Sequence, residues 1–322
     1  MRFDLTDDQR DFAASLDALV AGSDPVATVR SWASGDTAPG RALWRRLAEQ
    51  GVPALVVPED DGGLGASPVE LVLAMEVLGR HAVPGPWIES AALLATVLTG
   101  ADREAVAGGA LATAAAPPLA PLALDALAAD LVFVVDAEGV ATALAADSRN
   151  SVDASRRLAE VSAHGPHREV AADVLARGLD LAALAAAAQL LGAGERVLAD
   201  AVAYVKQRRQ FGREIGSYQS IKHHLADVRI ALDFARPLVF GAALDPTPRA
   251  VSAAKVAASD AAYLATRTGL QVHGAIGYTR EFDLSIWITR VRALVGAWGT
   301  PTHHRARLLD DLLAARTGGG VA

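Results

Sequence analysis

The side chains best suited to bind a phosphorylated ligand lie in two glycine-containing segments that are far apart along the chain. The first, Arg208–Gly212, reads RRQFG and is followed by Gln219, and the second, Gln271–Tyr278, reads QVHGAIGY. A guanidinium group can bind a diphosphate through paired hydrogen bonds, and glycine lets a backbone approach a ligand closely. The two segments therefore indicate a diphosphate-binding site. The alternative is that Arg208 and Arg209 belong to a solvated run of charges.

The histidines do not predict a metal site. They include two adjacent pairs, His223-His224 and His303-His304. Neighbouring side chains on a helix point about 100° apart, so such a pair rarely shares a metal without further ligands. We interpret His273, in the second segment, as part of a glycine-rich turn rather than as a catalytic base.

The composition excludes several classes of partner. The 322 residues carry a net charge of −7, which argues against a nucleic-acid partner, because that requires a basic face. The chain has no cysteine, so it offers neither a disulfide framework nor a thiolate nucleophile. Its first residues are acidic and do not resemble a signal peptide. No apolar run reaches the roughly 18–20 residues of a membrane span, so we expect a cytoplasmic protein without membrane contact.

Residues 1–109 are predicted to form a helical domain. Thr6 and Gln9 have the spacing of a capping box, in which each side chain bonds the other residue's backbone N–H at the start of a helix. Ser67 and Glu70 have the same spacing before a second helical pattern.

The remaining chain is predicted to hold a small β domain and a helical bundle. Within residues 110–172, the run Leu131–Val135 is β-branched and aromatic, so it reads as a strand, with 140–144 as its hairpin partner. Residues 173–322 read as an antiparallel four-helix bundle. Its helices are expected at 180–208, 217–244, 247–276 and 283–316.

This order of elements resembles the acyl-CoA dehydrogenase family, which is mainly α with a small β middle domain. The motifs that carry the resemblance are VPEDDGGLG at Val57–Gly65, VDASRRLAE at Val152–Glu160, and Lys206–Asp227 together with Gln271–Tyr278. The resemblance implies the cofactor FAD, an acyl-CoA substrate and α,β-dehydrogenation of its thioester. It also implies which residues contact FAD, across a subunit interface: Arg208, Gln210, Phe211, Gln219, Gln271 and Gly274. Ala275 stands where relatives usually have glycine.

The resemblance further implies a catalytic carboxylate, which this sequence lacks at both of the family's usual positions. The first is a glutamate before a Gly-Thr pair, whereas here Trp298 precedes Gly299-Thr300. The second aligns near Ala182. Asp180 lies two positions away, on a different helix face, and Glu195 lies further along the helix. We therefore predict no catalytic residue in this chain.

A second absence concerns the cover of the flavin ring. Relatives carry a Thr-Glu-Pro-like strand and a Trp-Ile-Thr/Ser strand over the ring, whereas this chain offers only ATAAAP at Ala112–Pro117. In this respect it resembles the short subunit of heteromeric acyl-CoA dehydrogenases of bacterial steroid degradation. That resemblance implies an α2β2 heterotetramer whose full-length partner provides the base. The alternatives are a self-sufficient homotetramer with Asp180 as the first candidate base, and a structural or regulatory paralogue without flavin.

Overall fold

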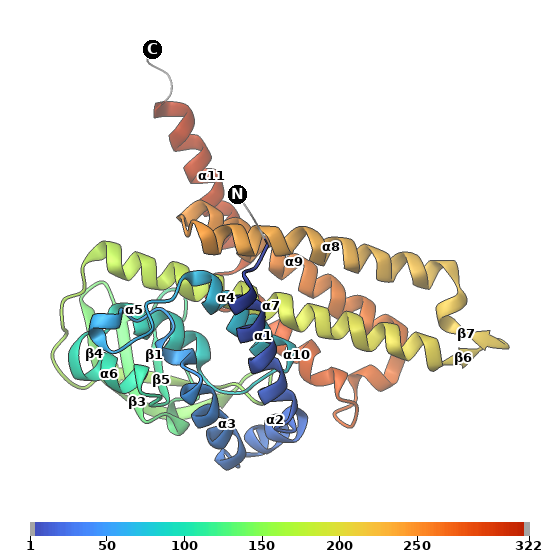
Figure 1. The fold of residues 1–322 in the computed structure, drawn as a ribbon, viewed down its shortest axis with the longest axis horizontal. Coiled ribbons are helices and arrows are strands. Elements are labelled where there is room, and N and C mark those ends of the chain that lie inside the picture. Colours follow the sequence, from blue (N-terminus) through green and yellow to red (C-terminus); the bar gives the residue numbers. More distant parts are fainter. Residues whose placement is uncertain (1–3, 319–322) are drawn as a thin grey trace.

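Long helices run side by side through the molecule, with a small sheet near one end (Figure 1). The computed structural model describes residues 4–318, so the outermost residues of the first and last predicted domains, 1–3 and 319–322, lie outside it. The predicted fold class, mainly α with a small β part, is confirmed. The predicted boundaries at residues 109 and 172 stay a prediction.

The N-terminal part is helical, as predicted. Thr6 forms the expected capping box with Gln9 at the start of the first helix. The Ser67 hydroxyl accepts the Val69 N–H and donates to the Glu70 carboxylate at 2.5 Å, so it caps a second helix. The helices are α1 (Asp7–Ala21), α2 (Pro25–Ser34), α3 (Ala38–Glu49), α4 (Pro68–Arg80), a π-helical turn (Glu89–Leu94), α5 (Ala95–Val97) and α6 (Gly100–Ala107).

A five-stranded sheet follows, with the strand order β1-β3-β4-β5-β2. The predicted hairpin is confirmed: β3 pairs with β4 in antiparallel register, with Val135 opposite Val140 and Asp136 opposite Gly139. Phe133 and Val135 point into the core, which explains the apolar run of this strand. The strands are β1 (Ala112–Ala115), β2 (Ala123–Leu124), β3 (Leu131–Asp136), β4 (Gly139–Asn150) and β5 (Arg157–Ala163).

The helical bundle differs from the prediction in its last member. The expected single helix at 283–316 is wrong, because the chain breaks at Trp298 and Gly299, which both have a left-handed φ, of 55° and 95°. Pro301 then starts a new helix, a position where its missing N–H costs nothing. The bundle helices are α7 (Ala172–Gln207), α8 (Gln219–Leu244), α9 (Pro248–His273) and α10 (Leu284–Gly296), and α11 (Pro301–Gly318) projects from it (Figure 1).

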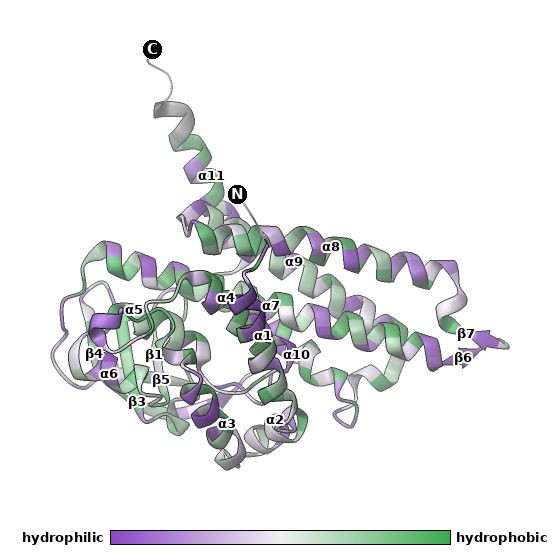
Figure 2. Ribbon diagram, in the orientation of Figure 1, coloured by the Kyte–Doolittle hydropathy of each residue, from purple (hydrophilic) through white to green (hydrophobic). Residues whose placement is uncertain are grey.

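Helix α7 is the central element, since α4, α8, α9 and α10 all pack against it. By length and composition, an 18-residue window of α7 could cross a membrane, which the prediction of no such run had missed. However, 72% of that window is buried inside the fold, so packing accounts for its apolar character. Hydrophilic residues gather instead at the short hairpin where α7 ends (Figure 2).

Candidate functional site

The end of α7 continues into a small hairpin that holds part of the predicted site. Strand β6 (Arg209–Gln210) pairs with β7 (Arg213–Glu214). The turn between them contains Phe211 and Gly212, both with positive φ, of 54° and 84°. Arg208 precedes β6, where its N–H donates to the Tyr204 carbonyl at 2.9 Å and its carbonyl accepts from Ile215 at 2.8 Å. The hairpin therefore fixes the backbone, and the Gln210 side-chain amide donates to the neighbouring Arg209 carbonyl at 2.8 Å.

The hairpin side chains are strongly exposed. Phe211 is 91% exposed, so its ring makes little contact with its own chain. Arg208 and Gln210 are exposed as well, and so is Gln219 at the start of α8. Arg208 takes part in none of the ion pairs within the described residues.

A pocket of about 1170 Å³ lies over α9, between α8 and α10. Gln271 and Gly274 line it, whereas the other predicted cofactor residues do not. Gly274 has a left-handed φ of 67°, and a Cβ there would meet nothing within 4 Å, so glycine is required by the backbone turn rather than by lack of space. The lining residues are His224, Tyr263, Leu264, Thr266, Arg267, Thr268, Leu270, Gln271, Val272, Gly274, Ala275, Tyr278, Ile288 and Arg292.

A small apolar cluster brings the hairpin and the pocket to the same end of the bundle. Its buried members are Ala201 and Val205 from α7 and Val272 from α9. Ile215, just after the hairpin, and Ile221, near the start of α8, pack against it. The two sequence segments singled out above are therefore neighbours in the fold, although they do not share one pocket.

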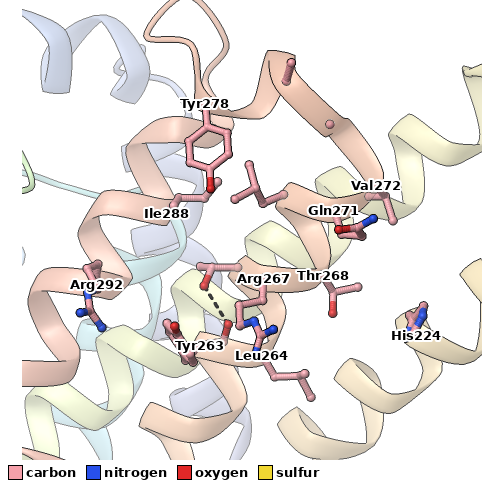
Figure 3. Close-up of a pocket in the computed structure, with 14 residues that line it drawn as sticks. His224, Tyr263, Leu264, Arg267, Thr268, Gln271, Val272, Tyr278, Ile288 and Arg292 are labelled. Atoms are coloured by element: carbon pink, nitrogen blue, oxygen red, sulfur yellow. Dashed lines mark hydrogen bonds between the residues drawn. The ribbon is translucent and has the colours of Figure 1, made fainter.

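The pocket is also lined by Arg267, which the sequence did not single out, and by Arg292 and His224. Arg292 lies on one side and His224 on the other, with Arg267 between them (Figure 3). Neither arginine belongs to an ion pair formed within residues 4–318. Arg267 lies one helical turn before Gln271, and that spacing was the available signal. The structure also separates Arg292 from Arg290, which is buried elsewhere.

His273 has a structural role, as expected. Its side chain is buried, its Nδ1 donates to the Gly269 carbonyl at 2.7 Å, and its ring stacks on Tyr204 with 4.1 Å between centroids. Burial lowers the pKa of His273, against the opposing effect of the hydrogen bond to Gly269.

At the position of the family's usual glutamate, Trp298 is buried, with 1% of its surface exposed. Two side chains fix the turn around it. The Lys255 ammonium donates to the carbonyls of Leu294, Val295 and Gly299 at 3.2 to 3.3 Å, and the His304 Nε2 donates to the Trp298 carbonyl at 3.0 Å. Burial lowers the pKa of His304 to about 4, so this histidine is neutral.

The two acids on α7 that were weighed as substitutes for the base are held by arginines. Asp180 is buried and accepts two hydrogen bonds from Arg307 of α11, at 2.5 and 3.0 Å. Glu195 accepts two from Arg229, both at 2.7 Å. Such bidentate pairs fix the orientation of a carboxylate as well as its charge.

Comparisons with known proteins agree with this architecture. Residues 6–105 match the acyl-CoA dehydrogenase N-terminal domain, and residues 172–315 match the acyl-CoA dehydrogenase C-terminal domain. The chain is 33% identical over 317 residues to the acyl-CoA dehydrogenase IpdE2 of Mycobacterium tuberculosis, covering 94% of this chain and 96% of that protein.

Solved structures share the fold. A chain of the ChsE4–ChsE5 complex from Mycobacterium tuberculosis superimposes with a TM-score of 0.82 at 22% identity, over 100% of both chains. A chain of the Tcur3481–Tcur3483 steroid ACAD superimposes with a TM-score of 0.83 at 21% identity, over 97% of this chain and 99% of that one. Both terminal regions of the chain match domains of this family, and IpdE2 aligns with nearly the whole chain. The chain therefore belongs to the acyl-CoA dehydrogenase family.

Proposed function

We propose that this chain is a subunit of an FAD-dependent acyl-CoA dehydrogenase and completes the FAD site of a full-length partner subunit in an α2β2 heterotetramer. The observation that carries the proposal is a contrast within one chain. Side chains suited to bind a diphosphate are present and exposed at the end of the bundle, whereas the position of the family's base holds the buried Trp298.

The residues at the bundle end fit a flavin dinucleotide in their chemistry. Arg208 would provide charged donors for the diphosphate, and the amides of Gln210, Gln219 and Gln271 would provide further hydrogen bonds. The open space beside Gly274 would admit the dinucleotide close to the backbone. When bound, FAD supplies the acceptor of two electrons for oxidation of the thioester. The high exposure of Phe211 supports a site that a second chain covers.

The two positions weighed for the family's base do not support proton removal from a substrate in this chain. A general base must reach the α-proton with a free acceptor. The indole of Trp298 offers none, and both oxygens of Asp180 are engaged by Arg307. The base would therefore come from the partner, and this chain would contribute binding and orientation of the cofactor.

The relatives suggest the class of substrate. The Tcur3481–Tcur3483 protein is a steroid ACAD, and ChsE4–ChsE5 is a complex of two proteins. By analogy with the steroid ACAD we propose a steroid-derived acyl-CoA thioester as the substrate. We also propose a cytoplasmic location for this chain, as the sequence led us to expect. We also propose that it divides into domains at 1–109, 110–172 and 173–322.

Expression of the chain alone and together with a full-length acyl-CoA dehydrogenase tests the proposal. We expect flavin absorbance and its bleaching by an acyl-CoA only in the joint preparation. A yellow protein that turns over by itself would support the homotetramer instead. Absence of flavin from both preparations would support a structural or regulatory paralogue.

A further inference from the structure

Away from the bundle end, Glu89 is a buried carboxyl group with one unsatisfied oxygen. It begins the π-helical turn Glu89–Leu94 and is 4% exposed. Its Oε2 has no hydrogen-bond partner among the described residues. Burial raises the pKa of Glu89 to about 7, although the positive charge of Arg156 opposes this shift.

The charges around Glu89 come from three other parts of the chain. Arg290 of α10 and Asp153 form a buried pair at 2.5 Å, so these two charges offset one another. Arg156 remains, with Glu89 and Asp125 as its counter-ions. Burial raises the pKa of Asp125 to about 6, and its Oδ2 also lacks a hydrogen-bond partner. When both carboxyl groups are protonated, the cluster has one unmatched positive charge, on Arg156.

Arg156 and Glu89 face a cavity of about 260 Å³. The rest of its wall is mainly apolar and includes Trp298. Pro121 is exposed and Leu122 is partly exposed, so the cavity opens to the surface at this loop. The remaining lining residues are Leu119, Ala120, Leu124, Ser151, Leu158, Ala293, Gly296 and Ala297.

The guanidinium of Arg156 is available to a ligand. Arg156 is 7% exposed, yet none of the side-chain hydrogen bonds in the described part of the chain uses it. A buried guanidinium without such partners is costly, and a carboxylate is the group that best satisfies its planar set of donors.

We propose that this cavity binds a small monocarboxylate, with the carboxylate on Arg156 and the hydrocarbon part among the apolar residues. An apolar cavity of about 150 Å³ holds benzene, so this one accommodates a chain of roughly six to eight carbons. The ligand carboxylate replaces Glu89 as the counter-ion of Arg156, and Glu89 takes up a proton as the ligand binds. This site is separate from the proposed FAD site and does not depend on it.

The coupling to a proton gives the binding a distinctive pH dependence. The charged groups that act on Glu89 are Arg156, whose charge favours its ionised form, and Asp125, whose charge opposes it; a hydrogen bond from Trp298 also favours the ionised form. Below pH 7 Glu89 is protonated and leaves Arg156 to the ligand. Above pH 7 the ionised Glu89 competes with the ligand for the same guanidinium. Between pH 6 and pH 8 the protonated fraction of such a group falls about tenfold, and the affinity falls with it.

Calorimetric titration of the full chain with sodium hexanoate tests the site. We expect binding at pH 6 that is about tenfold weaker at pH 8. Glu89→Gln should keep the binding and remove the pH dependence above pH 7, because glutamine cannot ionise and Asp125, with a pKa of about 6, is already largely ionised there. Gly296→Leu should weaken binding, because Gly296 lines the cavity and a Cβ there meets nothing within 4 Å, so a leucine side chain has room beside the ligand's hydrocarbon part.

Matched ligands separate the proposal from its alternatives. 1-Hexanol has the same hydrocarbon part without the charge, and hexanoyl-CoA has the same acyl group as a thioester. Equal binding of hexanol would refute the role of Arg156. Tighter binding of hexanoyl-CoA, or hexanoate affinity that is unchanged in Gly296→Leu, would refute the carboxylate site. Absence of hexanoate binding at pH 6 would refute it outright, and none of these results bears on FAD at the bundle end.

Discussion

Replacement of Arg208 by alanine tests the proposed FAD site with little disturbance of the fold. The Arg208 side chain is exposed and forms no ion pair within the described residues. Its two contacts to Tyr204 and Ile215 use backbone atoms, which alanine keeps. Exposed substitutions of this kind usually change the free energy of unfolding by no more than about 0.5 kcal/mol. A loss of flavin from the variant would therefore report on binding.

The size of the effect follows from the proposed contact. Hydrogen bonds to a charged group contribute about 1.5–3 kcal/mol. Since about 1.4 kcal/mol corresponds to a factor of ten, Arg208→Ala should raise the dissociation constant of FAD roughly 10- to 150-fold. The chain should keep its fold, because the apolar cluster around Val205 and Val272 is unchanged, and we therefore expect the subunits to stay associated.

The assay compares the purified complexes of the wild type and the variant. Flavin absorbance per protein gives the FAD content, a fluorescence titration with added FAD gives the dissociation constant, and gel filtration shows whether the subunits remain together. Arg209→Ala is the matched control, since it removes the same charge from the next residue of the hairpin. Unchanged FAD affinity in Arg208→Ala, or an equal loss in the control, would refute the assignment of Arg208.

Three further substitutions test the packing, the absent base and the buried charge. Gly79→Ala places a Cβ 2.1 Å from the Gln189 carbonyl oxygen, so we expect the free energy of unfolding, measured by thermal denaturation, to fall by about 1–3 kcal/mol. In the control Gly296→Ala, the new Cβ meets nothing within 4 Å, and we expect no change in stability. Equal melting temperatures of the two variants would contradict the close contact of α4 and α7. Asp180→Asn should lower the melting temperature and leave turnover of the complex unchanged, and lost turnover with normal flavin content would make Asp180 the base. Because burial raises the pKa of Glu89 from 4.5 to about 7, the folded state holds a proton that the unfolded state releases in this range, so stability falls as the pH rises through it. Between pH 5 and pH 8, the free energy of unfolding of the wild type, measured by chemical denaturation, should fall by up to about 3 kcal/mol relative to that of Glu89→Gln. The same pH dependence of stability in both proteins would contradict the burial of the charge.

Local patterns in the sequence predicted most of the elements. The caps at Thr6 and Ser67 and the apolar alternation of β3 and β4 depend on residues a few positions apart, so they can be read directly. The break between α10 and α11 was missed, although Gly299 and Pro301 are ordinary signals of a turn and a helix start. Because the helical pattern continues on both sides of Gly299 and Pro301, the prediction placed a single helix across them.

The sequence by itself determined the family, the order of the elements and the absence of a glutamate at Trp298, because each depends on residue identity along the chain. Only the tertiary structure decided which distant residues meet. It pairs Asp180 with Arg307 and brings Glu89 beside Arg156 at the wall of a cavity. Periodicity reveals which face of a helix is buried, but the partner of a buried charge depends on how separate elements pack in three dimensions.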